Sequence, residues 1–561
     1  MAAVQSPLEV EAQWLSNGTS PVQPLPGPFN TTSLGLFHHV QPPPPHILAL
    51  TWLLAAILPL IFLSPKQRAS IMSNALNPIL TLTTRYHTLD RKKTLSGPNY
   101  VWPFGNFRHM FAESRALSHK WRKEYGDIYR IWTGLYSEVV ISTPADIATF
   151  YSDSASHKKT LALRSNWVVN NLLGACVGFA NGHDWKRNRK ALDPLLANNV
   201  AVKHLGRIQQ EASEFVASIA ATRVDGGTNE ETMIIKAAGS FLPFTLNETT
   251  SIFFGPLSDE EKRELWDVCL AFMGIVDTAL LKGPFRWGLG YWMHSREEYR
   301  TAKEYLARWE AFVTRASAAR KDQTELPITK LWRDVEAGNL SKDELLQTLT
   351  ESTVFNLEPT SHALIMTIFL IADNQTFQDE LVAEFEANRH DITRYLGRKD
   401  TLLHYAFLEA VRVQPVLPFT LPEAASVDKE LSGYLIPKGL RLDIPLTLPV
   451  QTSVITDSYG INVRNPIWGP DATSYRPSRF TTLTPSEIQR NLSMFGFGAR
   501  KCLGQFFADK QVRAVVFHLF DRYKVTCCDY SGIEPGFKVD KTEYVDRFGL
   551  EFLLQARGGK S

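Results

Sequence analysis

The chain has 561 residues, of which 44% are hydrophobic and 21% are charged, so it can enclose a large core and has the composition of a globular protein. Its formal net charge of +2 is too small to indicate nucleic-acid binding. The five cysteines are odd in number and spread along the chain, which argues against a disulfide framework or a zinc spacing. We therefore expect a reducing, cytosolic setting for the main domain and no nucleic-acid partner.

The start of the chain differs from the rest. Residues 1–45 contain neither Lys nor Arg and are rich in Pro, Ser, Thr and Asn; such a segment buries too little apolar surface to fold, so we predict a disordered tail. An apolar run from Ile47 to Leu63 follows, close to the lower length limit of a membrane-spanning helix. We expect one transmembrane helix over residues 46–64, with a buried helix of a soluble core as the alternative.

Basic residues follow this run, beginning with Lys66 and Arg68, and none precedes it. Positive flanks stay on the cytoplasmic side, and a cleaved signal peptide would carry them before its apolar run. The interpretation is a single-pass protein of the endoplasmic reticulum membrane with a lumenal tail. The sequons at Asn17 and Asn30 are then glycosylation candidates.

Residues 65–94 are interpreted as a linker to one domain over residues 95–561. The domain's hydrophobic patterns are mainly helical, with short strands at the edges. Strands are predicted at 128–132, 138–142 and within 430–450. Helices are predicted at 345–372, 378–387 and 402–413, and from just after residue 502 to about 523. The predicted fold class is mainly α with small β-sheets.

The most specific motif is the segment Phe495–Gly504, which reads Phe-Gly-Phe-Gly-Ala-Arg-Lys-Cys-Leu-Gly. Cys502 stands where the last helix is expected to begin, and a helix N-terminus with nearby positive charge favours a thiolate. Gly498 and Gly504 allow the backbone to turn tightly. A lone cysteine is more often a buried, inert side chain, which is our interpretation of the other four cysteines.

This segment resembles the haem-ligand loop of the cytochrome P450 family, Phe-x-x-Gly-x-Arg-x-Cys-x-Gly, at every fixed position. The resemblance implies a P450 fold over about residues 95–555, haem b as cofactor, and Cys502 as the axial iron ligand whose thiolate favours O–O cleavage. It also implies that Phe495 shields the sulfur. Arg500 is expected to pair with a haem propionate through charge-assisted hydrogen bonds.

Two other spacings fit the family. Glu409 and Arg412 are three residues apart on a predicted helix and share a face; with Arg479 from a later loop, the resemblance implies a buried charge network that locks the haem side of the fold. Trp185 and Arg189 lie four apart on an early helix. In the family these two side chains bind haem propionates, although the spacing alone fits a packed helix face equally well.

The sequence departs from the family where an acid should precede the oxygen-binding threonine. Thr360 matches that threonine, but Pro359 takes the place of the acid, and Glu358 stands one residue early. Pro359 also removes a helix hydrogen bond to the carbonyl of Phe355, which would open the helix there. We hypothesise that Thr360 delivers protons with Glu358 and water. The segment is similar to that of fungal members that tailor peptide-derived toxins, which suggests secondary metabolism.

A second departure is Pro422-Glu423, where many members have Pro-Arg to bind a propionate. The propionate charge must then be met by Arg500, Arg189, Trp185 or another group.

We therefore expect a membrane-anchored monooxygenase that oxidises a small apolar natural product by hydroxylation, epoxidation, desaturation or coupling. It would use O2 and electrons from an NADPH–cytochrome reductase. Four basic residues are candidates for the reductase-docking face, although a solvated surface explains them equally well: Lys501, Lys510, Arg187 and Lys190. Two alternatives stay open. One is an isomerase or dehydratase of the same fold that does not activate O2, and the other is a non-catalytic haem-binding protein.

Overall fold

The computed structural model describes residues 63–106, 110, 114–160, 167–225, 231–277, 296–440, 450–528 and 550–558. The predicted tail, its sequons at Asn17 and Asn30, and nearly all of the predicted transmembrane helix lie outside these residues. Residues Ser64–Ser561 form one compact unit. Among the described residues, the stretch Lys342–Asp373 is long and apolar enough to cross a membrane, but it is mostly buried, as a core helix of a soluble domain would be.

The segment expected to be a linker contains helix α2 (Pro65–Thr83). Ser64 caps this helix: its hydroxyl accepts the Gln67 N–H, and the Gln67 side chain bonds back to the Ser64 backbone. The Asn77 side chain accepts the backbone N–H of Tyr100 at 2.9 Å, which ties the helix to the following chain. Helix α2 is therefore part of the compact unit, which begins at Ser64.

Five short strands form the main sheet, in the order β1-β2-β10-β5-β3. Strands β1 (Ile128–Thr133) and β2 (Tyr136–Ile141) form an antiparallel hairpin. Gly134 lies in the turn between them with a φ of 59°, a left-handed conformation that glycine adopts without steric strain. These two strands confirm the ones predicted at 128–132 and 138–142, although β2 begins two residues before its predicted start.

Strand β10 (Ser453–Thr456) runs parallel to β2, and the short β5 (Glu423–Ala424) pairs with both β10 and β3 (Lys158–Lys159). The register sets Lys159 opposite Glu423. The other sheets are small: β11-β12-β4 (Tyr523–Cys527, Glu551–Ala556, Thr232–Lys236), β6-β7 (Lys429–Leu431, Tyr434–Ile436) and β8-β9 (Gly439–Leu440, Val450–Gln451).

The long apolar stretch predicted at 345–372 follows one path but changes its hydrogen bonding twice. It comprises α15 (Lys342–Leu349), a π-helical turn η5 (Thr350–Phe355) and α16 (Leu357–Asp373). The Asn356 N–H bonds to the Glu351 carbonyl, five residues back, which marks the π turn.

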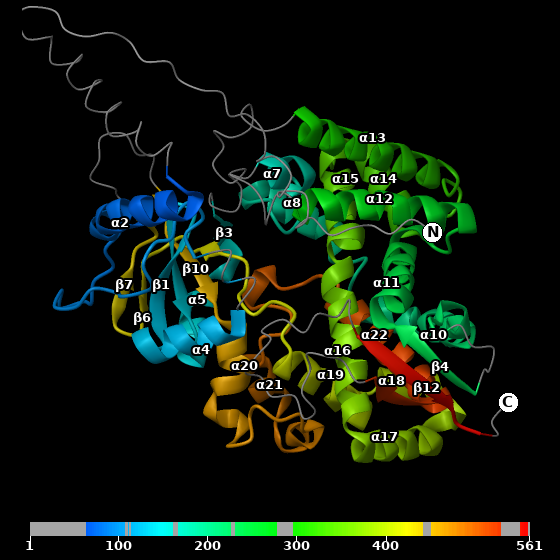
Figure 1. The fold of residues 1–561 in the computed structure, drawn as a ribbon. Coiled ribbons are helices and arrows are strands. Elements are labelled where there is room, and N and C mark those ends of the chain that lie inside the picture. The colour runs from blue at the N-terminus through cyan, green and yellow to red at the C-terminus, as the bar shows by residue number, and fades with distance from the viewer. Residues whose placement is uncertain are drawn as a thin grey trace, which may run out of the picture. The chain divides into compact units, whose positions relative to one another are not determined.

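Helix α16 is the centre of the helical part. It packs against α11 (Ala237–Phe254), α19 (Leu402–Val413) and α22 (Gln505–Arg522), and Figure 1 shows it running through the middle of that part. Helix α10 (Leu205–Ser218) packs on α22 and α11. Of the helices, α16 contributes a long run of residues to the large hydrophobic cluster, and its neighbours α11, α19 and α22 contribute to the same cluster, so the core lies around α16.

The remaining helices cover this core and the sheet. They are α4 (Ser114–Tyr125), α5 (Pro144–Tyr151), η1 (Ser154–Ser156), α7 (Trp167–Leu173), α8 (Gly182–Leu192), α9 (Asn198–Lys203), η2 (Ile219–Thr222), α12 (Asp259–Asp277), α13 (Arg296–Ala318), α14 (Pro327–Glu336), α17 (Gln375–Asn388), η6 (Arg389–Asp391), α18 (Ile392–Gly397), α20 (Ser458–Arg464), η7 (Pro466–Trp468), η8 (Pro477–Thr482), α21 (Pro485–Asn491) and η9 (Gly498–Arg500). The described residues are mainly helical with small sheets, as predicted.

Candidate active site

The loop before α22 holds Cys502 in a fixed turn. The Cys502 N–H donates to the Phe495 carbonyl at 2.9 Å, which closes the loop. Gly498 has a φ of 69°, and a Cβ there would lie 2.2 Å from the Ser154 hydroxyl oxygen. The same hydroxyl accepts the Ala499 N–H at 2.9 Å. A glycine at 498 is therefore required both by backbone conformation and by space.

The Cys502 thiol is accessible and yet desolvated. Burial raises its pKa to about 11, although the backbone N–H of Gly504 and the charge of Arg189 act in the opposite direction. The positive surroundings expected from the sequence are present, but burial outweighs them, so a metal cation bound to the sulfur is what would hold the thiolate form.

Three residues predicted to bind propionates gather beside this loop. The Arg500 guanidinium lies 4.9 Å from the centre of the Trp185 ring and donates to the Ala180 carbonyl at 2.6 Å. Arg189 donates to the Lys501 carbonyl at 3.2 Å. A thiol with two guanidinium groups and an indole at one edge is a donor set that fits a haem with its propionates. Phe495 lies half-buried against the core in the same loop.

Glu423 occupies the place where the family has a propionate-binding arginine. It is buried in β5, accepts a bond from Lys159 Nζ at 2.9 Å and lies 3.2 Å from His157 Nδ1. Burial opposes its ionisation, but the Lys159 charge and the His157 hydrogen bond hold its pKa at about 2. The acid is therefore ionised and paired. Lys159 and His157 carry no sequence motif: the register of β3 on β5 sets Lys159 opposite Glu423, and His157 lies two residues before Lys159.

The predicted charge network is assembled and fully enclosed. Arg412 forms a bidentate pair with Glu409 at 2.6 and 2.8 Å, and Arg479 Nε reaches the same carboxylate at 2.8 Å. Arg412 also donates to the carbonyls of Asn462 and Ala472. The network fastens α19 to η8 and to the chain before it. Asn462, which accepts from Arg412, is also bonded to Ser493, two residues before the Cys502 loop.

The helix is interrupted just before Pro359, at Asn356. The π turn ends at Phe355, and Pro359 lies in the first turn of α16, where backbone N–H groups have no partner within the helix in any case. Thr360 N–H bonds to the Asn356 carbonyl at 3.2 Å. The proline thus fits the restarted helix at no cost in hydrogen bonds.

Thr360 and Glu358 face different neighbours. Thr360 lines a small cavity between α11, α16 and α22. Burial raises the pKa of the Cys269 thiol on α12 to about 12, and the Glu358 carboxylate adds to that shift, so Glu358 lies near α12. Glu358 and Thr360 are also two residues apart on α16, which places them about 200° apart around the helix axis.

Two of the four basic residues proposed for the docking face, Lys510 and Arg187, bind other residues of the chain. Lys510 is 3% exposed and bonds to Asn198 and to the Phe506 carbonyl, so its placement on a docking face is wrong. Arg187 is paired with Glu344 and Asp184. Lys190 is exposed and Lys501 is half-exposed, and these two remain candidates.

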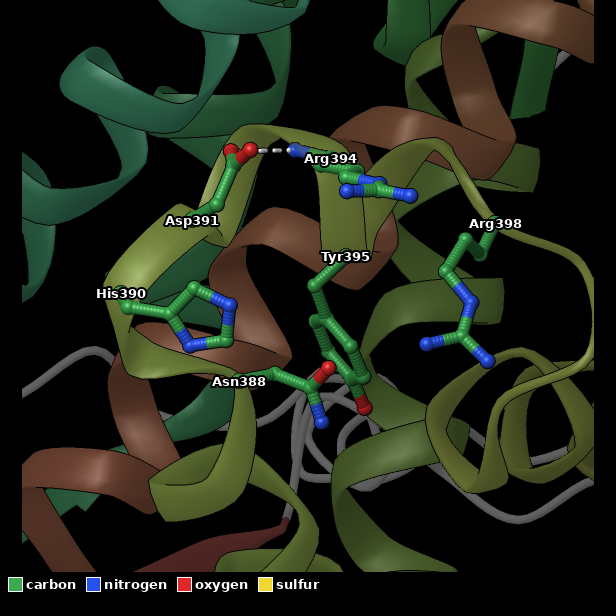
Figure 2. A pocket seen from close by; sticks show the side chains of 6 residues that line it. All are labelled: Asn388, His390, Asp391, Arg394, Tyr395 and Arg398. Atoms are coloured by element: carbon green, nitrogen blue, oxygen red, sulfur yellow. Dashed lines mark hydrogen bonds between the residues drawn. The ribbon is translucent and has the colours of Figure 1, made fainter.

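A separate pocket of about 220 Å³ lies at the junction of α17, η6 and α18, as Figure 2 shows. Its lining is polar: Asn388, His390, Asp391, Arg394, Tyr395 and Arg398. It includes neither Cys502 nor Thr360, and an apolar compound would find few partners there. We therefore do not assign it to the substrate.

Comparisons with known proteins agree with the geometry. The family model for cytochrome P450 matches residues 95–540. The chain is 35% identical to the cytochrome P450 monooxygenase hasH of Aspergillus fumigatus, over 89% of this chain and 91% of that protein. It is 32% identical to sirC of Leptosphaeria maculans (82% and 87% covered) and 31% identical to gliC of Aspergillus fumigatus (80% and 86%), both also named cytochrome P450 monooxygenases.

Proposed function

The chain belongs to the cytochrome P450 family, and on that premise we propose that it oxidises a small apolar natural product, with electrons from an NADPH–cytochrome reductase. As a family member with monooxygenase relatives, it is an oxidoreductase whose haem iron is ligated by a cysteine thiolate. The observation that carries the proposal is the Cys502 loop, closed by the bond from the Cys502 N–H to the Phe495 carbonyl, with Arg500 of the same loop stacked on Trp185.

When bound, haem supplies oxygen activation, and a thiolate ligand favours O–O cleavage. Cys502 would ligate the iron from the start of α22, with Phe495 packed beside it. Arg500, Arg189 and Trp185 would hold the propionates at one edge by charge and hydrogen bonding. Thr360, in the restarted turn of α16, would hold oxygen and pass protons to it; Glu358 is the acid proposed from the sequence to assist.

Deleting the gene in the producing organism is expected to accumulate a less oxidised precursor of a secondary metabolite. Microsomes that contain this protein and a reductase should convert that precursor only when NADPH is present, and isotopically labelled O2 should appear in hydroxylated or epoxidised product. Conversion without NADPH or reductase would instead favour the isomerase or dehydratase alternative. The monooxygenase names of the relatives favour the first result.

The proposed location is the endoplasmic reticulum membrane, with residues 46–64 as a single span and a lumenal tail that carries Asn17 and Asn30. Helix α2 supports it, because Ile71, Ile79 and Leu82 are 46%, 53% and 59% exposed. Their spacing places them on one face of the helix. An apolar stripe directly after an apolar run suits contact with lipid.

Replacing Ile79 and Leu82 by Ser is therefore expected to weaken membrane binding of a variant that lacks residues 1–63. These two exposed side chains would be partly buried in lipid when the protein binds a membrane. Their loss should lower the bound fraction roughly tenfold or more in a vesicle sedimentation assay. The control is Val224→Ser, which removes a similarly exposed side chain (47%) outside α2, in the segment between η2 and β4. Equal binding of both variants would contradict a lipid-facing role for α2.

A further inference from the structure

Residues 174–181 connect α7 to α8 and are mostly buried. Helix α7, which leads into this segment, packs against α15 and the π turn η5 (Figure 1). Backbone groups of a buried segment need hydrogen-bond partners. Side chains supply these partners from two directions, the central helix and the Cys502 loop.

Two side chains of the central helix hold the segment by its backbone. Gln347 of α15 accepts the Ala175 N–H at 2.7 Å and donates to the Asn171 carbonyl at 3.1 Å. Glu351, one turn later in the π turn, accepts the Gly178 N–H at 3.0 Å. Helix residues four apart share a face, so this face of the helix serves as the support for the segment.

Gly178 and the Glu351 carboxyl are matched to each other. A Cβ at position 178 would lie 1.9 Å from Glu351 Oε1, so a residue without a side chain is what lets the carboxyl approach the backbone there. Burial raises the pKa of this carboxyl, and the hydrogen bonds from the Cys176 thiol and the Gly178 N–H act in the opposite direction. The contact is therefore specific in both shape and hydrogen bonding.

The same segment holds the Arg500 guanidinium. Arg500 Nη2 donates to the Ala180 carbonyl at 2.6 Å and to the Gly178 carbonyl at 3.4 Å, and Nη1 donates to Asn181 Oδ1 at 3.1 Å. A further bond from Nη1 reaches the His157 carbonyl at 3.3 Å. Three acceptors of this guanidinium thus lie within four residues of one segment, and a group held in place in this way binds an anion at a smaller entropic cost.

We propose that Glu351 is a positioning residue for Arg500: it fixes residues 174–181 at Gly178, and that segment holds the guanidinium in the orientation in which it binds a haem propionate. The inference rests on the assignment of Arg500 to a propionate in the proposed function. Gly178 is the link, because its N–H bonds to Glu351 and its carbonyl accepts from Arg500. Glu351 therefore acts on the haem site through Arg500.

The replacement of an arginine by Glu423 increases the importance of this support. Glu423 stands where a propionate-binding arginine would be expected, and the charge of Lys159 and the His157 hydrogen bond hold its pKa at about 2, so it is ionised. Lys159 is paired with this carboxylate at 2.9 Å. Fewer positive groups are left for the propionates, and the orientation of Arg500 matters correspondingly more.

The propionate bending mode in the resonance Raman spectrum of the ferric holoenzyme tests the inference without turnover, because it responds to hydrogen bonding of the propionates. Glu351→Leu removes the acceptor at similar volume and is expected to shift this mode in the same direction as Arg500→Lys. Glu351→Gln keeps an acceptor for the Gly178 N–H and should leave the mode at its wild-type position. Gln347→Leu is the matched control: it loosens the segment at Ala175, while Glu351 still holds Gly178, and should not move the mode.

The rate of haem transfer to apomyoglobin provides a second readout. Glu351→Leu should release haem about tenfold faster, because a hydrogen bond to a charged group is worth about that factor. Gly178→Ala should have a similar effect, since the added Cβ displaces the carboxyl. Both changes break the same contact, so the double variant Gly178→Ala/Glu351→Leu should be no faster than the single ones. Gly206→Ala on α10, where a Cβ meets nothing within 4 Å, should keep the wild-type rate.

Four outcomes would overturn the inference: an unchanged propionate mode in Glu351→Leu, an equal shift in Glu351→Gln, an equal shift in Gln347→Leu, or additive rates in the double variant. If Arg500→Lys also leaves the mode in place, the assignment of Arg500 to a propionate fails first. A response of Arg500→Lys without one in Glu351→Leu leaves that assignment standing and removes this inference alone. The reduced carbon monoxide spectrum of each variant verifies that the cysteine ligand is intact.

Discussion

Cys502→Ser is expected to abolish the thiolate-type band of the reduced carbon monoxide difference spectrum, together with all NADPH-dependent turnover. A serine hydroxyl is a far weaker electron donor than a thiolate, so iron held there would lose the push that favours O–O cleavage. The loop itself should survive, because it is closed by the Cys502 backbone N–H on the Phe495 carbonyl, which the substitution leaves in place.

Cys527→Ser is the matched control, since Cys527 is a second free cysteine that is half-buried and lies on β11. Its spectrum and haem-to-protein ratio should equal those of wild type. A thiolate-type band that persists in Cys502→Ser, or that disappears in Cys527→Ser, would contradict the assignment of Cys502 as the ligand.

Glu409→Gln is expected to cost about 3–5 kcal/mol of unfolding free energy, the usual penalty for removing one partner of a buried ion pair. The substitution keeps the volume of the side chain but leaves Arg412 and Arg479 enclosed with no countercharge at Glu409. The measurement is chemical denaturation of the haem-loaded protein. A lower denaturation midpoint and poor haem retention are expected together, since Asn462 connects the network to Ser493, two residues before the Cys502 loop.

Asp400→Asn provides the comparison, because the Asp400 side chain is 69% exposed and pairs with Arg398 at 3.0 Å on the surface. Exposed pairs contribute about 1 kcal/mol or less, so its midpoint should barely move. If Glu409→Gln cost no more than Asp400→Asn, the enclosed network would not be what holds this side of the fold.

The sequence predicted those elements whose ends are determined by neighbouring residues, such as helix caps and prolines. Helix α19 matches its predicted range of 402–413 because Thr401 caps it by accepting the His404 N–H, and Pro415 follows closely. The Cys502 loop was also predictable, because its glycines and arginine are needed at fixed distances from the cysteine.

Features made by tertiary contacts were not predictable in the same way. Lys159 meets Glu423 only through the pairing of β3 with β5, and Lys510 is buried because α9 covers α22. The π turn before Pro359 depends on a change of hydrogen bonding that hydrophobic periodicity does not record.

The exposed stripe on α2 has a kinetic consequence for an enzyme of apolar compounds. On the membrane location proposed above, Ile71, Ile79 and Leu82, which are exposed, would contact lipid, and the catalytic domain would draw an apolar substrate from the bilayer, into which such compounds partition. The concentration that governs saturation is then the amount of substrate per volume of lipid rather than per volume of cytosol. Two cells with the same total substrate but different membrane content would therefore run this enzyme at different rates.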